Sequence, residues 1–229
     1  MPLLQFTLHY LNSTSVATIA VTDMVIAGWT GRDVAAVEHH IHELEAIGVP
    51  RPSQVPLFYR VSAALATQDT SVEVLGGESS GEIEPVLFTH GGELWLSIGS
   101  DHTDRKVEGY SVAVSKQMCV KPIARDAWRL ADVMAHWDSL EIRSYIEEGG
   151  QRVRYQNGRL AAMRTPQDLI SRYTVGGTLL PAGTLMTCGT VGAIGGIRAA
   201  SGLEMELTDP TTGRVLRHAY RVRTLPVVS

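Results

Sequence analysis

Two glutamates separated by one residue are the first candidates for chemistry in this sequence. Glu82 and Glu84 lie at the start of the predicted strand 82–88, where successive side chains alternate between the two faces. Both carboxylates would therefore project from one face, about 6.5–7 Å apart along the chain. Two carboxylates in a cleft repel each other unless a cation or a proton lies between them, which points to Mg²⁺, Mn²⁺ or Ca²⁺. The alternative is the solvent-facing polar edge of a hairpin.

Glycines recur densely in a second candidate segment, between Thr187 and Gly196. Backbone N–H groups can approach an anion closely in such a segment, and Thr190, beside Gly189, adds a hydroxyl donor. No lysine follows the run as in a P-loop, and no strand–helix dinucleotide unit surrounds it. Barrel corners and bulges also require glycine, so a purely structural role is the alternative.

A polar loop follows the predicted strand 93–99 and contains Asp101 and His102. Functional residues concentrate on loops, and a histidine that titrates near neutral pH can act as a general base. A solvated turn is the alternative interpretation. Arg60 could pair with an acidic group of a ligand. The candidates for substrate contact are Tyr59, Arg60, Ser80, Gly189 and Thr190.

The elements that must position these residues are mostly strands. Alternation predicts strands at the N-terminus, and Gly91 and Gly92 turn the chain between strands 82–88 and 93–99 as in a β-hairpin. The predicted strands cover residues 3–11, 16–21, 25–29, 57–61, 82–88, 93–99, 109–116 and 140–146, with two more around 209–213. The sequence thus predicts an α+β protein that is mainly β.

Three helices are predicted. The first begins after the capping residues Thr30–Asp33, follows apolar residues at helical spacing and stops at Gly48. Its three histidines and three glutamates are explained by the polar face of an amphipathic helix better than by a metal site. A second helix is expected from Pro122 to Trp137 and a third from Thr165 to Tyr173. The proline-rich connector 49–56 suggests an N-terminal β/helix segment, 1–56, packed on a catalytic domain, 57–229.

Composition excludes several classes of function. The 229 residues are 44% hydrophobic and 19% charged, and the formal net charge is −4 with no basic run, so nucleic acid and anionic lipid are poor partners. The 22 glycines favour a turn-rich β protein. Cys119 and Cys188 cannot build a disulfide framework and are expected to be buried, reduced thiols of a cytoplasmic protein. The first 21 residues resemble neither a signal peptide nor a membrane span.

Four segments occur in an order that resembles the fumarylacetoacetate hydrolase superfamily. They are Gly81–Glu84, Gly109–Val112, Gly177–Leu185 and Thr187–Thr190. The similarity covers about residues 78–225, and within the superfamily the chain looks like the divergent branch DUF2848. The resemblance implies a mixed β-roll, usually a homodimer, with a Mg²⁺-type ion that polarises an enolisable keto acid. It also implies that Glu82 and Glu84 bind the metal and that Thr190 contacts the substrate.

The chain departs from this family at two positions. The resemblance implies a third metal-binding Asp at the end of the Gly-Tyr strand, where the alignment places Ser115 followed by Lys116. The family's catalytic histidine has no counterpart after Arg60. Either Asp101 or His102 supplies the missing ligand or base, or Lys116 replaces the cation in a metal-free enzyme. Such a lysine would polarise a carbonyl, or act as a nucleophile if its pKa fell, unless it is simply a surface strand residue.

These observations predict a hydrolase that cleaves a C–C bond in a small keto or diketo acid. The residues expected to do the chemistry are His102, Lys116 and Asp101, with Mg²⁺ or Mn²⁺ on Glu82 and Glu84 unless the enzyme is metal-free. One alternative keeps the fold but performs lyase, dehydratase or decarboxylase chemistry on a sugar-acid-like 2-keto acid. Another is an inactive member of the fold that binds a metabolite.

Overall fold

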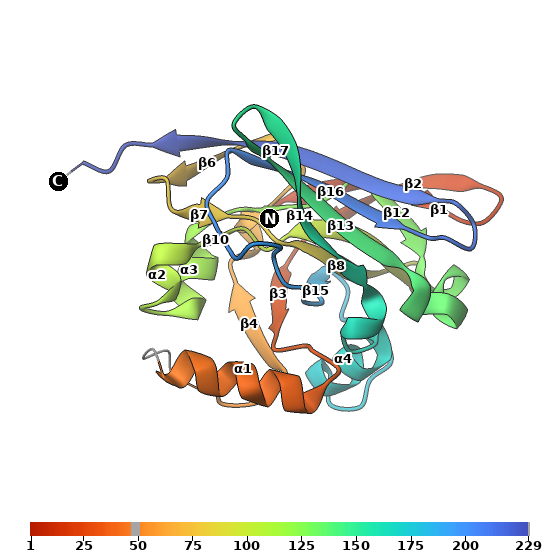
Figure 1. The fold of residues 1–229 in the computed structure, drawn as a ribbon. Helices are drawn as coiled ribbons and strands as arrows, with labels where there is room; N and C mark the ends of the chain where they lie inside the picture. The colour runs from red at the N-terminus through yellow and green to blue at the C-terminus, as the bar shows by residue number, and fades with distance from the viewer. Residues whose placement is uncertain (47–50, 229) are drawn as a thin grey trace.

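Two β-sheets pack face to face and contain most of the strand residues (Figure 1). The computed structural model describes residues 1–46 and 51–228. The larger sheet has eight strands in the order β2 (Thr14–Ala20), β1 (Leu3–His9), β12 (Asp126–Arg129), β9 (Glu93–Ser100), β8 (Ile83–His90), β15 (Thr184–Thr187), β3 (Asp23–Gly28) and β4 (Leu57–Val61). Both parallel and antiparallel pairs occur in it, so the predicted mainly-β, mixed-sheet fold is confirmed.

The second sheet has five strands, and two short ladders lie beside the main sheets. The five strands follow the order β14 (Gln151–Arg159), β13 (Glu141–Glu148), β16 (Gly202–Thr208), β17 (Val215–Leu225) and β6 (Ser71–Leu75). The short ladders pair β10 (Thr103–Asp104) with β7 (Ser79–Ser80) and β11 (Lys121–Pro122) with β5 (Ala66–Thr67).

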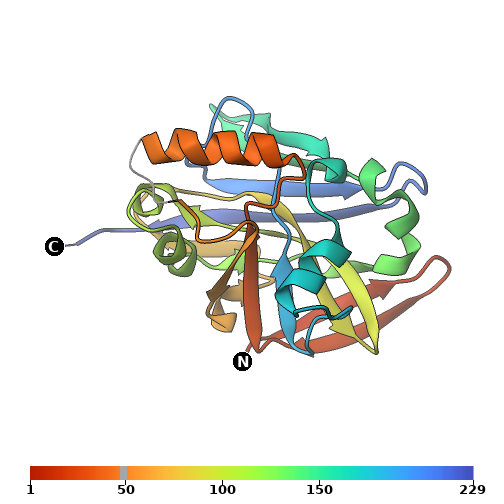
Figure 2. The same ribbon diagram turned by 90° about the horizontal axis from the view of Figure 1, so that it is seen from below.

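The helices are short, apart from α1 (Val34–Ala46), which lies at the edge of the molecule next to the connection that leaves β3 (Figure 2). The other α-helices are α2 (Arg105–Glu108), α3 (Val112–Met118) and α4 (Pro166–Tyr173). Short 3₁₀ helices cover Ala63–Leu65, Leu130–Asp132, Met134–Ser139 and Leu160–Ala162.

Alternation along β8 explains why this strand is buried on both faces. Leu87 points into the core between the two sheets, while its neighbours Val86 and Phe88 belong to a second core on the outer face of the larger sheet. Successive side chains of a strand point to opposite faces, so a nearly continuous apolar run requires cover on both sides. Phe6 of β1 provides part of this cover by stacking on Phe88 with ring centroids 4.5 Å apart.

Several predicted elements are confirmed. The hairpin of β8 and β9, the strand that became β13, the helix α4 and the closing pair β16 and β17 all lie where they were expected. Helix α1 matches the first predicted helix through Ala46. Its predicted end at Gly48 and the first two residues of the proline-rich connector lie outside the described residues.

Two predicted elements were wrong. Residues 109–116 were expected to form a strand but form the end of the α2 turn and most of α3, because Ser111 caps the helix by accepting a hydrogen bond from the Val114 N–H at 3.3 Å. The helix expected from Pro122 to Trp137 is instead β11, β12 and 3₁₀ turns. Strand β12 inserts between β1 and β9, and this tertiary pairing outweighs its local helical pattern.

The N-terminal segment contributes directly to the larger sheet. β1 pairs with β12, and β3 pairs with both β15 and β4, so strand pairing crosses the division expected at residue 56. Cys119 and Cys188 are buried and free, as expected. Among the described helices, none is long and apolar enough to cross a membrane. The homodimer and the cytoplasmic location stay predictions.

Candidate active site

One pocket of about 1130 Å³ gathers most of the predicted site residues. It opens between the start of α1, the helices α2 and α3, the end of β3 and the start of β8. Its charged lining residues are Arg32, Asp33, Glu82, Glu84, Asp101, Arg105, Glu108 and Lys116. Tyr59, Gly189 and Thr190 line it as well. The pocket therefore brings together seven of the ten candidate residues, the exceptions being Arg60, Ser80 and His102.

The pairing of β8 with β9 brings three carboxyl groups into this pocket. Glu84 lies in β8, and Glu82 comes just before that strand. Asp101 comes just after β9, and its backbone N–H donates to the Glu82 carbonyl at 3.0 Å. Of the two residues expected as alternatives for a third ligand or base, Asp101 therefore lies in the pocket beside the glutamates. Ser115, where the alignment placed the family's third metal-binding residue, lies in α3 rather than in a strand and donates its hydroxyl to the Val112 carbonyl at 2.8 Å.

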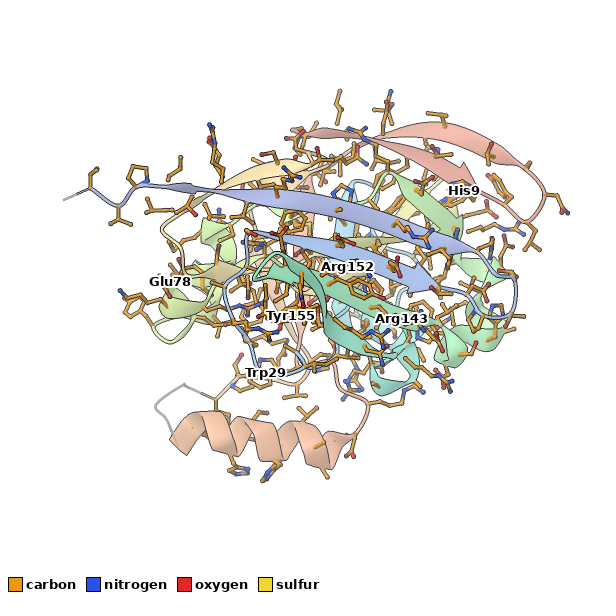
Figure 3. The ribbon with its side chains drawn as sticks, turned by 45° about the horizontal axis from the view of Figure 1, so that its top comes forward. His9, Trp29, Glu78, Arg143, Arg152 and Tyr155 are labelled. Carbon is orange, nitrogen blue, oxygen red and sulfur yellow. The ribbon has the colours of Figure 1, made fainter. Side chains whose placement is uncertain are left out.

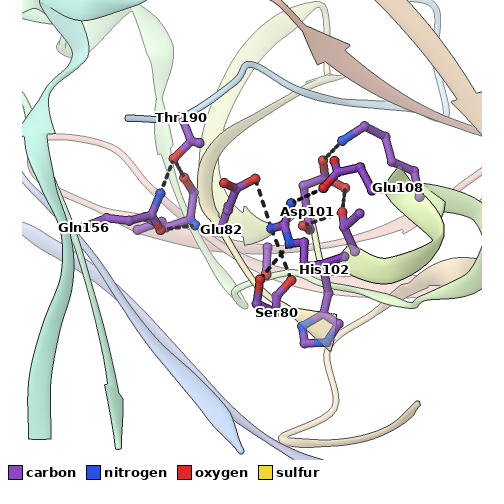
Figure 4. Close-up of polar contacts among 12 residues, drawn as sticks. Ser80, Glu82, Asp101, His102, Glu108, Gln156 and Thr190 are labelled. Carbon is purple, nitrogen blue, oxygen red and sulfur yellow. Dashed lines mark hydrogen bonds and ion pairs between the residues drawn. The ribbon is translucent and has the colours of Figure 1, made fainter. Parts of the chain in front are cut away.

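Three cations surround the carboxylates. The Lys116 ammonium donates to Asp101 Oδ2, and Lys121 Nζ lies 3.2 Å from Asp101 Oδ1. The Arg105 guanidinium lies 3.2 Å from Glu82 Oε2 and donates to Glu108 at 3.0 Å. Lys116 is thus a buried residue of helix α3, with 7% of its surface exposed, rather than a surface residue of a strand. Figure 4 shows Asp101 and Glu108 on one side of Glu82, and Thr190 and Gln156 on the other.

The environment of the site shifts the pKa values of Asp101 and Glu84 in opposite directions. Burial opposes ionisation of Asp101, but the adjacent Lys116 and Lys121 charges overcome it and hold its pKa well below the usual range. Burial, reinforced by the negative charge of Asp101, raises the pKa of Glu84 to about 8. Burial lowers the pKa of Lys116, but Asp101 more than offsets this and keeps it above the usual lysine value. At neutral pH the site therefore contains an Asp101–Lys116 ion pair beside a mostly protonated Glu84.

The glycine-rich segment orders Glu84 rather than offering a free anion cradle. The Gly189 N–H donates to Glu84 Oε2 at 2.9 Å. Gly189 has φ +86°, and a Cβ there would lie 1.7 Å from Thr30 Oγ1, so only glycine fits. The Thr190 hydroxyl donates to the Ile83 carbonyl and accepts from Gln156 Nε2 at 2.8 Å. Both expected donors are thus used within the protein, which speaks against their expected role of orienting a substrate carboxylate.

His102 lies behind the pocket, in the interior. Its Nδ1 lies 2.7 Å from the Tyr220 hydroxyl and its Nε2 2.9 Å from Ser79 Oγ, and only 1% of the residue is exposed. Burial and the charge of Lys121 lower its pKa to about 3. A neutral ring with both nitrogens occupied is poorly suited to the expected role of general base, so this geometry makes His102 a connector between the two sheets.

Arg60 and Ser80 also lie outside the pocket lining, whereas Tyr59 lies within it. Arg60 pairs with Asp23 and donates to the Tyr173 hydroxyl at 3.3 Å, which leaves it a structural role. Ser80 Oγ accepts from Arg105 Nε at 2.7 Å and so orients a residue of the site. The Tyr59 ring lies 5.6 Å from the Lys116 ammonium, a cation–π arrangement that adds to the contacts of this charge.

Sequence reasoning missed Arg105, Lys121 and Gln156. Arg105 is the last residue of the polar loop that was singled out, but no role was assigned to it, so its position was a usable signal. Gln156 is fully buried and comes from β14 of the five-stranded sheet. Its Oε1 accepts from the N–H of Ile83 in β8 at 3.0 Å, and its Nε2 donates to Thr190 and to the Val191 carbonyl. Nothing in the local sequence of β14 indicates this contact.

The donor set is chemically suited to a divalent cation, but its arrangement is not. Three carboxyl groups are oxygen donors of the kind that Mg²⁺ and Mn²⁺ prefer. Within residues 1–46 and 51–228, however, no three His, Cys, Asp or Glu side chains are placed to hold a metal ion. Asp101 is bonded to Lys116 and Lys121, and Glu82 is paired with Arg105. In this arrangement the residues do not fit the ion, because ammonium and guanidinium groups already neutralise two of the carboxylates.

Comparison with solved structures shows which fold this is. A protein from Oleispira antarctica assigned as a fumarylacetoacetate isomerase/hydrolase matches with a TM-score of 0.65 and 16% identity, over 95% of this chain and 99% of that one. A protein from Burkholderia cenocepacia assigned as a fumarylpyruvate hydrolase matches with a TM-score of 0.64 and 17% identity, over 97% and 92% of the two chains. A 2-keto-3-deoxy-D-arabinonate dehydratase in complex with magnesium and 2,5-dioxopentanoate matches with a TM-score of 0.63 and 15% identity, over 95% and 79%.

These neighbours establish the fumarylacetoacetate hydrolase-like fold, which confirms the predicted fold family. No curated protein matches the sequence significantly. The family model DUF2848, described as a protein of unknown function, matches residues 27–220. With this match over most of its length, the chain belongs to the DUF2848 family, whose fold here is that of the fumarylacetoacetate hydrolase superfamily.

Proposed function

We propose that the protein is a hydrolase that cleaves a C–C bond of a 2,4-diketo acid, using Lys116 as its resident cation. The observation that carries the proposal is the buried Lys116 ammonium, which Asp101 holds in the same pocket as Glu84. A fixed positive charge in a water-poor site stabilises an enolate oxygen far better than the same charge in water. The enzymes among the structural neighbours include assigned diketo-acid hydrolases, which supports this class of substrate.

Lys116 and Glu84 have complementary tasks in this proposal. The ammonium of Lys116 polarises the substrate carbonyl and stabilises the enolate that leaves. Ionised Glu84 takes a proton from water, and the resulting hydroxide adds to the distal carbonyl. The C–C bond then breaks toward the enolate, and the enolate carbon receives the proton from Glu84. The products are one carboxylic acid and one 2-keto acid, so atoms and charge balance.

The other charged residues keep this pair in order. Asp101 holds Lys116 protonated and in place, and the Gly189 N–H fixes one oxygen of Glu84. Arg105 pairs with Glu82 and Glu108, and burial raises the pKa of Glu84 to about 8. Burial raises the pKa of Glu82 as well, against the opposing charge of Arg105. A general base is most effective when its pKa lies near the working pH.

Dehydration of a sugar-acid-like 2-keto acid is the second candidate. It is favoured by the structural match to the dehydratase whose complex contains magnesium and 2,5-dioxopentanoate. The same two residues would serve, with Lys116 stabilising the enolate and protonated Glu84 donating to the departing hydroxyl. Product analysis with a 2,4-diketo acid and a 3-deoxy-2-keto acid separates the two reactions.

The test compares Lys116→Met and Glu84→Gln with the surface variant Glu148→Gln. Loss of an electrostatic stabiliser or of a general base lowers kcat by about 10²–10⁴-fold. We expect such losses in the first two variants and none in Glu148→Gln. Glu148 is exposed, pairs with Arg198 and lies outside the pocket lining. Full activity of Lys116→Met would contradict the proposal.

A further inference from the structure

We infer that the substrate carries an apolar substituent of several carbons, alkyl or aryl, attached to the keto-acid head. This inference rests on the proposed function for the head group. It concerns the part of the same pocket that the chemistry does not use.

The lining of the pocket contains the charged group that the chemistry uses and a second group that is largely apolar, with Arg32 and Asp33 of the β3–α1 connection next to this second group in the chain. The charged residues of the chemistry come from the ends of β8 and β9 and from the helices α2 and α3. A second group of lining residues is apolar and comes from the β3–α1 connection, the start of α1, the turn after β14 and the glycine-rich segment. These are Trp29, Ala36, Val37, Ala161, Ala162 and Ile197.

The β3–α1 connection, which supplies Trp29 to the apolar part of the lining, is fixed by its packing and by a hydrogen bond. Trp29 has φ +59°, an uncommon conformation for a bulky residue, and its indole N–H donates to the Tyr59 hydroxyl at 3.3 Å. Figure 3 shows Trp29 between α1 and the sheets. A Cβ at Gly31 would lie 2.6 Å from Val37 Cγ2, so the connection packs directly against α1. An uncommon backbone conformation that is kept in place beside a pocket is often associated with ligand binding.

The volume of the pocket and the exposure of Ile197 support an occupant that is larger and more apolar than a small keto acid. Pockets of about 300–1,000 Å³ enclose drug-sized ligands, and this pocket has about 1130 Å³, far more than a small keto acid requires. Ile197 is 53% exposed although it lines the pocket, so its side chain is available for contact with a ligand. Burying one methylene of a ligand there contributes about 0.8 kcal/mol, which is roughly a fourfold gain in affinity.

Binding is measured by calorimetry with unbranched 2-keto acids from three to eight carbons, which lack the second carbonyl and so are not cleaved. Turnover is measured separately with 2,4-diketo acids carrying methyl, pentyl or phenyl at the distal carbonyl. Ile197→Ser removes part of the apolar wall. The control is Ile194→Ser, because Ile194 is 49% exposed but lies outside the pocket lining.

We expect affinity to rise roughly fourfold per methylene, Ile197→Ser to weaken this dependence and Ile194→Ser to leave it unchanged. Affinity that is independent of chain length overturns the inference, even where the methyl diketo acid is cleaved and the proposed function stands. Chain-length-dependent binding without cleavage of any diketo acid supports the apolar subsite and overturns the proposed function. Absence of binding throughout the series overturns the inference.

Discussion

The backbone N–H of Asp101 donates to the carbonyl of Glu82 at 3.0 Å, across the open end of the β8–β9 hairpin. This contact places an aspartate from one strand end beside the glutamates of the other. Lys116 and Lys121, the two cations that pair with Asp101, therefore lie close to the glutamates as well. Three carboxyl groups and their countercharges thus converge because two neighbouring strands end together.

The raised pKa of Glu84 predicts a loss of stability as the pH rises above neutrality. The folded protein keeps this proton up to about pH 8, whereas the unfolded chain releases it near 4.5. Between these values the unfolded state binds fewer protons, so the free energy of unfolding falls with increasing pH. Urea titrations should show a loss of roughly 1 kcal/mol between pH 7 and pH 8.

Glu84→Gln should reduce this dependence of stability on pH, with the remainder due to Glu82, whose pKa burial also raises, and Glu148→Gln should keep it unchanged. His102 does not contribute between pH 7 and pH 8, because its lowered pKa affects the free energy of unfolding only below pH 6.5, the pKa of histidine in the unfolded chain. If the free energy of unfolding depends on pH equally in Glu84→Gln and in the wild type, then Glu84 ionises normally in the folded protein.

The pH–rate profile should identify Glu84, not His102, as the titrating base. Because ionised Glu84 is required, kcat/KM should rise with pH and level off above about pH 8. His102→Phe should keep this profile while lowering the free energy of unfolding by about 1–3 kcal/mol, since it removes the partners of Ser79 and Tyr220. If His102→Phe folds but loses the rising limb, then His102 is the base after all.

Metal dependence should differ between the wild type and Lys116→Met. The Asp101 carboxylate is engaged by two ammonium groups in the wild type, so millimolar Mg²⁺ or Mn²⁺ should leave its melting temperature nearly unchanged. In Lys116→Met the three carboxyl groups lose a cation, and added metal should raise the melting temperature by several degrees.

Asp126→Asn serves as the control for nonspecific metal effects, because Asp126 lies at the surface with His9 as its partner. A large stabilisation of the wild type by metal would show instead that the ion displaces Lys116 from Asp101.

Gln156 should act as a positioning residue. Gln156→Met removes four hydrogen bonds that hold Ile83, Ser144, Thr190 and Val191, and each buried group left unpaired costs about 1–3 kcal/mol. Among folded molecules we expect a lower kcat and a shifted pH–rate profile, because the residue between the two glutamates has lost its support. The control is Gln151→Met at the exposed start of β14. An unchanged profile in Gln156→Met would limit Gln156 to stability.

Much of the site was predictable because its elements are local. The hairpin of β8 and β9 follows from alternation and the Gly91–Gly92 turn, and the spacing of Glu82 and Glu84 places both in one pocket. The glycine-rich segment and the polar loop after β9 were also recognised as parts of the site, since strand ends and glycine-rich turns are where backbone and side chains remain available.

The sequence alone indicated the class of fold and the pair of glutamates, and it left Asp101 and His102 as alternatives for a third group beside them. Only the tertiary structure decided the charges of these groups. Residues 109–116 alternate like a strand, yet Ser111 caps a helix there, and this helix carries Lys116 into the pocket. Whether a carboxyl group holds its proton depends on burial and on charges distant in the chain, which is why Asp101 is ionised and Glu84 mostly protonated although both are buried.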